Sequence, residues 1–254
     1  MLADRAVIGV SGPEARPFLQ GLLTNDINLL APDRPLYAAL LAPQGKILFE
    51  FLIYDGGGDV LIDCHKDSRA ALIKRLTLYR LRAQIEIAAR DDCVVVADQG
   101  PDDPRLKTLG QRAIVAAATE TVDGTDAWHD WRWSLGVPEG ADFGSDQVFA
   151  MDGGLDELNA ISFTKGCYVG QELTARMKHR GTDRKRLLPV QSTPAPLPAA
   201  GTPMTADGAD VGTLMSSYGD CGFALVRLDR LGDATSAQVG GIKVSVIRPE
   251  WLFH

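Results

Sequence analysis

Short apolar runs alternate with amphipathic stretches over the first third of the chain. Runs typical of strands lie at residues 5–10, 37–41, 47–54 and 60–64, separated by turns rich in glycine and aspartate. Helices are predicted at 14–23 and at 67–81, where apolar side chains recur on one face. Residues 77–87 end the second helix and enter another strand. The resulting order β-α-β-β-α-β predicts a ferredoxin-like unit.

The pattern changes after Arg186. Before it, strands at 94–97 and 113–118 with a helix at 104–109 extend the α+β region, and residues 136–152 form a loop rich in glycine, proline and aspartate. After it, short strand candidates at 211–214, 221–228 and 242–247 lie between glycine turns, which is typical of a small antiparallel barrel. We therefore expect two domains, an α+β region over 1–186 and a β-barrel over 187–254.

Composition is that of an ordinary globular protein, with 254 residues of which 45% are hydrophobic and 23% charged. The net charge of −7 argues against nucleic acid as a partner, because such binding neutralises phosphates with Lys and Arg. The four cysteines are isolated, so neither a disulfide framework nor a zinc site is predicted.

No apolar stretch reaches the ~18 residues of a membrane span, and the first ten residues lack a signal-peptide pattern. We expect a soluble cytoplasmic protein without membrane contact.

The densest chemistry lies in residues 163–181, FTKGCYVGQELTARMKHRG. Gly166 lacks a Cβ, so the backbone ahead of Cys167 is able to turn tightly and approach a ligand. Good helix formers predict a helix over 168–178. Cys167 would then lie at the helix N-terminus beside Lys165, where the helix dipole and the cation favour the thiolate. A reactive or metal-binding cysteine is one interpretation, and a small buried cysteine is the other. The inner helix face is predicted to carry Val169, Leu173 and Met177.

Lys165–Glu172, KGCYVGQE, resembles the signature of the YgfZ/GcvT-like folate-binding proteins, relatives of the glycine cleavage T-protein that assist iron–sulfur cluster assembly or repair. The longer run ISFTKGCYVGQELTAR, with RKRLLPV at Arg184–Val190, is most similar to the mitochondrial and alphaproteobacterial branch, which acts late in [4Fe–4S] maturation. FLQGLLTND and TLYRLRAQIEI are further matches. The resemblance implies an α+β, T-protein-like folate-binding domain with ferredoxin-like elements, followed by a small C-terminal antiparallel β-barrel, and tetrahydrofolate as the cofactor.

For Cys167 the resemblance implies a catalytic thiol and a metal ligand. Iron–sulfur clusters normally take four protein ligands, mostly thiolates, and this chain offers one well-placed cysteine. Cys167 would therefore share a cluster with a partner, by hypothesis an A-type iron–sulfur scaffold. Redox or persulfide chemistry and a structural role are the alternatives. Gln171 and Glu172 would orient the cysteine loop, or Glu172 would form an ordinary surface ion pair with Arg176.

A pterin pocket needs aromatic surface and a few placed polar groups. Trp128 and Arg132 lie in AWHDWRWSLGVPEG, which resembles the family's folate-pocket segment, and a core cluster is the alternative. Two positions depart from the relatives: Ser134 replaces an acid, and Arg5 stands where some relatives have a folate-contacting tryptophan. The predicted ligand-contacting residues are Trp128, Arg132, Lys165, Gly166, Tyr168, Gly170, Gln171, Glu172 and Arg176.

A basic cluster follows the cysteine and comprises Arg176, Lys178, His179, Arg180, Arg184, Lys185 and Arg186. It is a surface for an acidic partner, a site for the glutamate tail of folate, an RNA contact, or simply a solvated face.

The leading hypothesis is a folate-binding accessory factor for assembly or repair of [4Fe–4S] clusters, acting through Cys167 with a partner scaffold. One alternative is a tetrahydrofolate-dependent aminomethyl or one-carbon transferase that uses Glu50, the one acid kept of the T-protein's acidic pair. Another is a tRNA-modification accessory protein that uses Arg180–Arg186. Whether the chain is an enzyme is left open.

Overall fold

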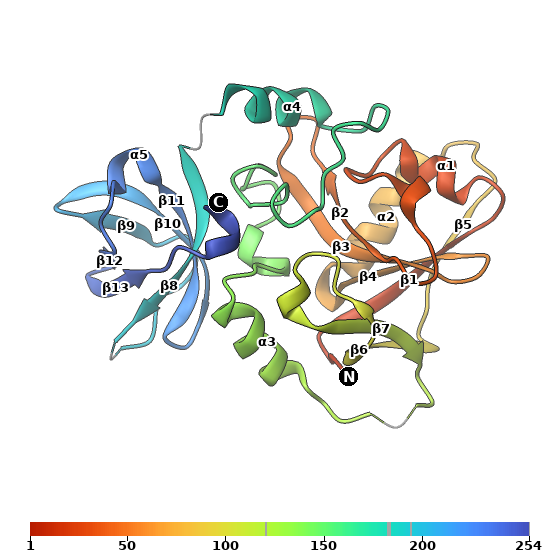
Figure 1. Ribbon diagram of the computed structural model, residues 1–254, viewed down its shortest axis with the longest axis horizontal. Coiled ribbons are helices and arrows are strands. Elements are labelled where there is room, and N and C mark those ends of the chain that lie inside the picture. The colour runs from red at the N-terminus through yellow and green to blue at the C-terminus, as the bar shows by residue number, and fades with distance from the viewer. Residues whose placement is uncertain (120, 182–183, 194, 254) are drawn as a thin grey trace.

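The computed structural model describes residues 1–119, 121–181, 184–193 and 195–253. Figure 1 shows two bodies side by side, an α+β region that holds the N-terminus and a barrel formed by the C-terminal strands. Helix α4 (Gln171–Arg180) lies along the top edge and leads from the first body to the second. In the part of the chain that is described, no helix has the length and apolar character needed to cross a bilayer.

Five antiparallel strands form the main sheet in the order β2-β3-β4-β1-β5. Without the edge strand β2, the remaining order is that of a ferredoxin-like unit, which confirms the prediction. Strand β2 matches the predicted strand at 37–41, which the predicted order β-α-β-β-α-β left out. The strands are β1 (Arg5–Ser11), β2 (Leu36–Leu41), β3 (Ile47–Asp55), β4 (Val60–His65) and β5 (Glu86–Ala89).

Both faces of this sheet are covered, which explains why its strands are nearly continuous apolar runs. One face packs against α1 (Ala15–Gln20) and α2 (Arg69–Arg80), where Ile8 belongs to the same core as Leu72 of α2. The neighbouring residue Val7 points to the other face and belongs to a second core, together with Trp128. Short 3₁₀ turns at Ile27–Leu29 and Lys66–Ser68 complete this region.

The second core is covered by a hairpin, a helix and the loops around them. The hairpin pairs β6 (Cys93–Asp102) with β7 (Gln111–Ala116), and α3 (Thr125–Ser134) follows it. The predicted helix at 104–109 is wrong: only a 3₁₀ turn at Lys107–Leu109 forms, because the Asp103 side chain accepts the backbone N–H of Arg105 and closes a turn instead. A further 3₁₀ turn, Gly140–Phe143, lies within the predicted loop 136–152.

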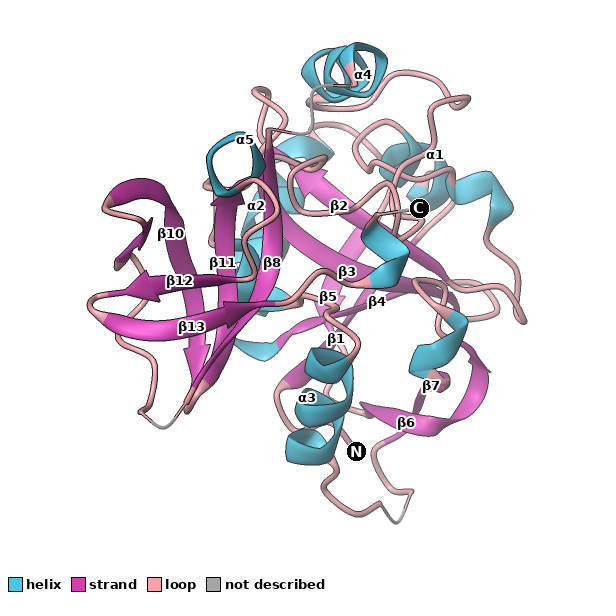
Figure 2. Cartoon of the chain, turned by 60° about the vertical axis from the view of Figure 1, so that its left-hand side comes forward, coloured by secondary structure: helices cyan, strands magenta, loops and turns pink. Residues whose placement is uncertain are grey.

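A closed barrel of six antiparallel strands forms the second body, in the order β10-β11-β8-β13-β12-β9, and confirms the predicted barrel (Figure 2). The first barrel strand, β8, begins at Lys185, two residues before Leu187. The boundary between two domains at Leu187 stays a prediction. The strands are β8 (Lys185–Ser192), β9 (Pro203–Ala206), β10 (Ala209–Tyr218), β11 (Cys221–Arg227), β12 (Ser236–Val239) and β13 (Ile242–Val246), with α5 (Leu228–Leu231) and a 3₁₀ turn at Glu250–Leu252.

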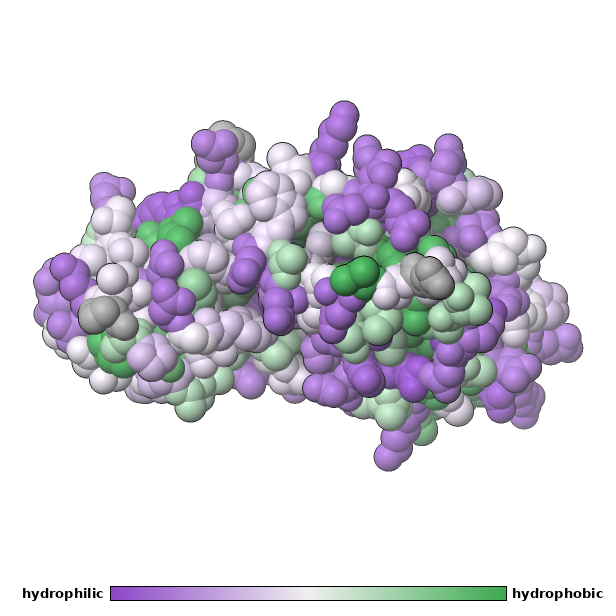
Figure 3. All heavy atoms as spheres, turned by 90° about the horizontal axis from the view of Figure 1, so that it is seen from below, coloured by the Kyte–Doolittle hydropathy of each residue, from purple (hydrophilic) through white to green (hydrophobic). Residues whose placement is uncertain are grey.

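The face opposite α4 is a mosaic of hydrophilic and hydrophobic residues (Figure 3). Apolar side chains gather in small groups there, and polar ones separate these groups. Scattered apolar residues of this kind are normal for a protein surface and require no partner.

Candidate functional site

The loop that carries Cys167 runs directly ahead of α4. The helix begins at Gln171 with Gly170 at its N-cap, so the prediction that Cys167 lies at the helix N-terminus is wrong. The reason is Gly170, whose φ of +83° belongs to the left-handed region and interrupts a right-handed helix. The buried position of α4 is Thr174, whereas the residues predicted for its inner face, Val169, Leu173 and Met177, are only half-buried.

Lys165 fastens this loop to the protein interior. Its Nζ donates hydrogen bonds to the backbone carbonyls of Gln20, Leu23 and Asn25, at 2.7, 2.7 and 2.8 Å. An ammonium group has three donors, so its donor capacity is fully used. Lys165 therefore anchors the loop, in place of the ligand contact predicted for it.

Tyr168 and Gly170 fix the other end of the loop. Tyr168 is buried in the second core, and its ring lies beneath the Lys165 ammonium, 5.3 Å from Nζ to the ring centroid. At Gly170 an added Cβ would lie 2.6 Å from the carbonyl oxygen of Ala42 and 2.9 Å from the Cβ of Leu41. Only glycine permits this approach to the turn after β2, so both residues have structural roles.

Between these anchors, Gly166 and Cys167 face solvent. Both are exposed, and a Cβ added to Gly166 would meet nothing within 4 Å. No contact within the protein requires glycine at this position. The close approach of a ligand to Gly166 stays a prediction. The open space leaves room for an approaching molecule.

The other three cysteines are less accessible. Cys64 is buried, and Cys93 and Cys221 are partly buried. Burial raises the pKa of Cys64 to about 12 and that of Cys221 to about 12, and it also raises the pKa of Cys93. No three His, Cys, Asp or Glu side chains among the described residues are grouped so that they could hold a metal ion. Those residues therefore do not complete a cluster around Cys167.

The polar residues at the start of α4 do not orient this loop. Gln171 is half-buried, and Glu172 and Arg176 are exposed on α4 without an ion pair between them. The orienting hydrogen bonds come from Lys165 instead, whose backbone N–H also donates to Ser162 Oγ at 3.3 Å.

The residues predicted to contact folate on α3 are enclosed by the protein itself. Trp128 is 4% exposed, and the guanidinium groups of Arg105 and Arg112 lie over its ring at 5.7 and 4.9 Å from the centroid. Arg132 is 1% exposed and donates to Asp142 Oδ2 at 2.7 Å. Internal charges thus occupy the surroundings of both residues, and their contact with folate stays a prediction.

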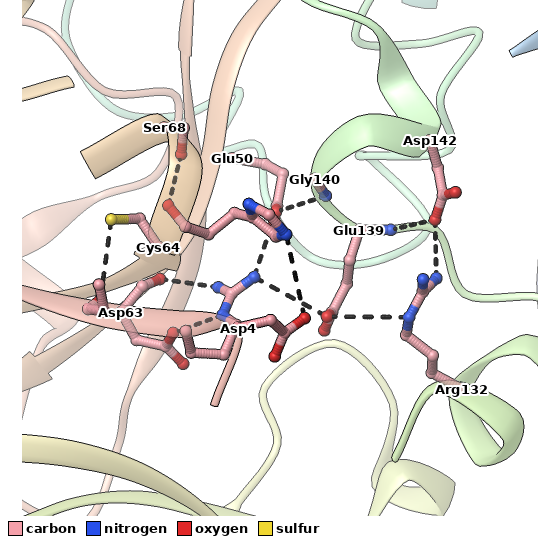
Figure 4. A network of polar contacts seen from close by, with 12 residues as sticks. Asp4, Glu50, Asp63, Cys64, Ser68, Arg132, Glu139, Gly140 and Asp142 are labelled. Atoms are coloured by element: carbon pink, nitrogen blue, oxygen red, sulfur yellow. Dashed lines mark hydrogen bonds and ion pairs between the residues drawn. The ribbon is translucent and has the colours of Figure 1, made fainter. Parts of the chain in front are cut away.

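Arg132 belongs to a buried network of charges in the α+β region, part of which is drawn in Figure 4, and Trp128 Nε1 donates a hydrogen bond to Glu139 Oε2 of this network at 3.3 Å. Its parts come from the main sheet, the β6–β7 hairpin, α3 and the turn after it. Arg5 donates from Nε to Asp63 Oδ1 at 2.7 Å, and the carboxylate of Glu139 pairs with Arg105 and Arg112. The members are Arg5, Arg105, Arg112, Arg132, Glu50, Asp63, Asp103, Glu139 and Asp142.

Glu139 remains a carboxylate at the centre of this network. Burial by itself would raise its pKa, but the charges of Arg105 and Arg112 outweigh burial and hold the pKa well below its usual range. Sequence reasoning missed most of this network. The signal was a charged residue inside an otherwise apolar strand, as with Asp63 in VLIDCH and Arg112 in QRAIVA.

A cavity of about 360 Å³ opens beside the network, between the start of β3, the start of α2 and the turn at 140–143. Glu50 lines it and accepts the backbone N–H of Gly140 at Oε1, at 3.0 Å. The second oxygen, Oε2, is buried without a hydrogen bond of good geometry, and so are the hydroxyl of Tyr37, which interacts with Glu50, and Arg5 Nη1, which lies 3.7 Å from Glu50 Oε1. A buried polar atom without a partner marks a place for a water or a ligand group.

Comparison with known proteins places this geometry in a family context. Residues 184–254 match the CAF17 C-terminal beta-barrel domain. The chain is 33% identical to the mitochondrial iron-sulfur cluster assembly factor IBA57 of Homo sapiens, over 91% of this chain and 77% of that protein. It is 29% identical to the Mus musculus protein of the same name, over 98% and 84% of the two chains.

A solved structure shares the fold. The glycine cleavage system aminomethyltransferase T from Bartonella henselae matches with a TM-score of 0.76 at 16% sequence identity, covering 98% of this chain and 84% of that chain. At this identity the likeness concerns the fold alone. It confirms the predicted T-protein-like α+β fold that is followed by a barrel.

The expected cytoplasmic location is wrong by the same comparison, since the matched relatives are named as mitochondrial proteins. Isolated free cysteines indicate a reducing compartment only, and they do not distinguish the cytoplasm from another one.

Proposed function

The chain belongs to the family of IBA57 iron–sulfur cluster assembly factors, and on that premise we propose that Cys167 ligates a cluster whose other thiolates come from a partner scaffold. The cluster is cargo in this proposal, and the chain supplies one of its ligands. The proton of the Cys167 thiol leaves as the thiolate binds iron.

The observation that carries this proposal is the way the cysteine loop is held. Lys165, Tyr168 and Gly170 fasten it from within, while Gly166 and Cys167 remain exposed on its outer side. A preorganised ligand on a supported loop binds a shared metal centre without the cost of ordering the loop. A partner of the A-type scaffold class would supply the remaining thiolates.

The test mixes the purified chain with an A-type scaffold that carries a reconstituted cluster, and follows the cluster by visible absorption and circular dichroism. We expect a new cluster spectrum with the wild-type chain and with Cys221→Ser, and no new spectrum with Cys167→Ser. Identical spectra for Cys167→Ser and the wild type would remove Cys167 from the mechanism.

The cellular counterpart is aconitase activity, which depends on a [4Fe–4S] cluster, in cells deleted for this gene. Complementation with the wild-type gene should restore the activity, and Cys167→Ser expressed at the same level should not. A deletion that leaves aconitase unchanged would contradict a role in [4Fe–4S] assembly and would favour the one-carbon transferase.

We further propose that tetrahydrofolate binds in the cavity beside Glu50, and not against Trp128. The free Oε2 of Glu50 fits the amino and ring N–H donors of a pterin, and Phe143 supplies apolar wall. When bound, tetrahydrofolate supplies ring nitrogens that accept one-carbon units. Glu50 would hold the pterin's donor edge, and Gly140 would keep the carboxylate oriented through its N–H.

Isothermal titration with tetrahydrofolate tests this site. Glu50→Gln should weaken binding about tenfold or more, because it replaces a charged acceptor by a neutral amide. Asp67→Asn is the matched control, since Asp67 lines the same cavity with an exposed side chain and should bind like the wild type. Equal affinity in Glu50→Gln would place folate elsewhere or exclude it. Turnover of a methylamine donor by the wild type, lost in Glu50→Gln, would favour the transferase.

A further inference from the structure

Helix α2 and the turn after it carry positive charges without any acidic residue between them. Residues 68–85 contain five cationic side chains and no aspartate or glutamate, in a chain whose net charge is −7. Arg69 pairs with Asp91, whereas the other four are exposed and form no ion pair within the described residues. These four, here called the α2 cations, are Lys74, Arg75, Arg80 and Arg82.

Two exposed leucines lie among the α2 cations. Leu72 and Leu76 belong to the core between α2 and the main sheet. Leu78 is instead 64% exposed, and Leu81, just after the helix, is 87% exposed. Because residues four apart share one face of a helix, Leu78 lies beside Lys74 on the outer side of α2. Neither exposed leucine contributes to the core.

The backbone at Leu81 is strained without a benefit to internal packing. The N–H of Ala83 donates to the carbonyl of Arg80 at 2.8 Å and closes a turn, in which Leu81 has a φ of +46° and a ψ of −105°. These angles are close to those of the first central residue of a type II′ turn, where glycine is usual. A bulky residue is disfavoured there. Strain that no internal contact compensates is typical of functional positions.

A groove of about 420 Å³ lies beside Leu81, between α1 and the turn after α2. Figure 1 shows α1 toward the end of the molecule opposite the barrel, so the barrel does not cover this side. Glu14 borders the groove, and its Oε2 accepts the backbone N–H of Gln84 at 2.6 Å. Apolar walls next to cations fit a molecule that has an acyl chain beside a phosphate. The walls include Pro17, Phe18, Tyr79, Arg80 and Arg82.

This combination favours an anionic lipid surface over RNA or an acidic protein. Surface helices that enter the boundary between lipid headgroups and acyl chains combine exposed leucines with lysines and arginines. RNA is held by aromatic rings that stack on its bases, and Phe18 and Tyr79 are only partly exposed here. The strongest contacts of protein partners are made by Trp, Tyr and Arg in closed pockets, and leucine is under-represented among them.

We propose that the end of α2 binds the surface of a membrane that contains anionic phospholipids. Leu78 and Leu81 enter the interfacial region, the α2 cations contact lipid phosphates, and the rest of the chain stays outside the bilayer. The expectation of no membrane contact rested on the absence of a spanning segment, and surface binding needs no such segment. The end of α2 is about 18 Å from its start, where the cavity beside Glu50 lies, so this surface is separate from that cavity.

The experiment measures flotation of the purified full chain with vesicles, at about 50 and about 300 mM salt. One set of vesicles is phosphatidylcholine alone, and the other contains about 30 mol% phosphatidylglycerol as the anionic lipid. The charge variant combines Arg80→Glu and Arg82→Glu. Its matched control combines Arg176→Glu and Arg180→Glu, which reverses two exposed arginines on α4.

A second pair of variants tests the apolar contact. Leu81→Gly removes the exposed leucine and supplies the residue that the turn favours, so it should weaken membrane binding without weakening the fold. Val122→Gly is the matched control, because Val122 is also 87% exposed. A single-stranded RNA of about 20 nucleotides is the competing probe.

We expect the wild type to bind the anionic vesicles at least about tenfold more tightly than phosphatidylcholine alone, and less tightly at the higher salt concentration. The charge variant and Leu81→Gly should each bind the anionic vesicles at least about tenfold more weakly than the wild type. Both controls should bind within about twofold of the wild type. The melting temperature of Leu81→Gly should be at least that of the wild type.

Four results would overturn the proposal. The wild type fails to bind anionic vesicles, the charge variant and its α4 control lose equal affinity, Leu81→Gly binds like the wild type, or the RNA binds more tightly than the vesicles do. The third result would reduce the contact to charge attraction toward any polyanion. A melting temperature of Leu81→Gly more than about 3 °C below that of the wild type would assign Leu81 to the fold and overturn its membrane role.

Discussion

Two glycines that look alike in the motif KGCYVGQE have different physical roles. Gly170 has a φ of +83° and lies against the backbone of Ala42, so it is needed for the fold. Gly166 has no close neighbour in the direction where a Cβ would point. Gly170 is therefore required by the packing of the fold, whereas Gly166 is open to solvent.

Replacing these glycines should separate stability from function. Gly170→Ala is expected to lower the free energy of unfolding by about 1–3 kcal/mol, because alanine is strained at that φ and collides with Ala42. Gly166→Ala should change it by less than about 0.5 kcal/mol. Urea unfolding followed by circular dichroism measures both. Equal losses in the two variants would contradict the different roles.

The four thiols should react at very different rates. At pH 8 a thiol with a pKa of about 12, as for Cys64 and Cys221, is ionised in roughly one molecule of 10,000. Iodoacetamide is therefore expected to alkylate the exposed Cys167 first, and labelling of Cys221 should increase as the pH rises toward 12. Mass spectrometry of tryptic peptides gives the order. Simultaneous labelling of Cys167 and Cys221 at pH 8 would contradict the predicted order of reactivity.

Among the elements, the cysteine loop depends on one buried ammonium group. Lys165 is the shared partner of three carbonyls from the last residue of α1 and the segment after it, so the loop and that part of the chain hold each other in place. Helix α4 then continues from a fixed point, since Gly170 and Thr174 pack against the turn after β2.

Lys165→Met should release this loop. The three carbonyls would lose their donor inside the protein, which is expected to cost at least about 2 kcal/mol of unfolding free energy. Hydrogen exchange of residues 163–170 should become faster than in the wild type. Lys178→Met is the control, because its ion pair with Asp156 is half-exposed and worth about 0–1 kcal/mol. Unchanged exchange in Lys165→Met would show that Tyr168 and Gly170 hold the loop alone.

For the molecule as a whole, the buried charge network joins parts that are distant in sequence. Asp142 accepts hydrogen bonds from Arg132 of α3 and from Ser216 of the barrel strand β10, and thus connects the two bodies. Removing one partner of a buried ion pair leaves the other charge without compensation, which is costly.

Asp142→Ala is therefore expected to lower the free energy of unfolding by about 3–5 kcal/mol, with a clear drop in melting temperature by calorimetry. Asp210→Ala removes an exposed pair with Arg230 and should cost at most about 1 kcal/mol. Equal melting temperatures for the two variants would show that the network contributes no more to stability than a surface ion pair does.

Acid should weaken the same network. The pKa of Glu139 is depressed in the folded protein, so its contribution to stability is present above the unfolded value of about 4.5 and is lost as the pH falls further. Urea midpoints measured from about pH 7 down to about pH 3 should decrease, and less steeply in Glu139→Gln. Parallel curves for the two proteins would show that other carboxylates cause the acid loss.

Periodicity in the sequence predicted those elements whose neighbours in sequence decide their structure. The strands of the main sheet, helix α2 and the barrel strands at 211–214, 221–228 and 242–247 follow from apolar runs between turns, and the motif around Cys167 located the thiol.

Contacts between distant residues decided the rest. The close approach of the Ala42 carbonyl leaves no room for a Cβ at residue 170, and Gly170 there adopts a left-handed φ, so α4 begins only at Gln171 and Cys167 lies in a loop. Arg105 and Arg112 reach Trp128 only through the tertiary fold, where they enclose a side chain that the sequence had suggested for folate. The local sequence pattern predicts which residues are buried and where the chain turns. The pairing of charges across the core depends on which chain segments meet there, and the sequence pattern does not show this.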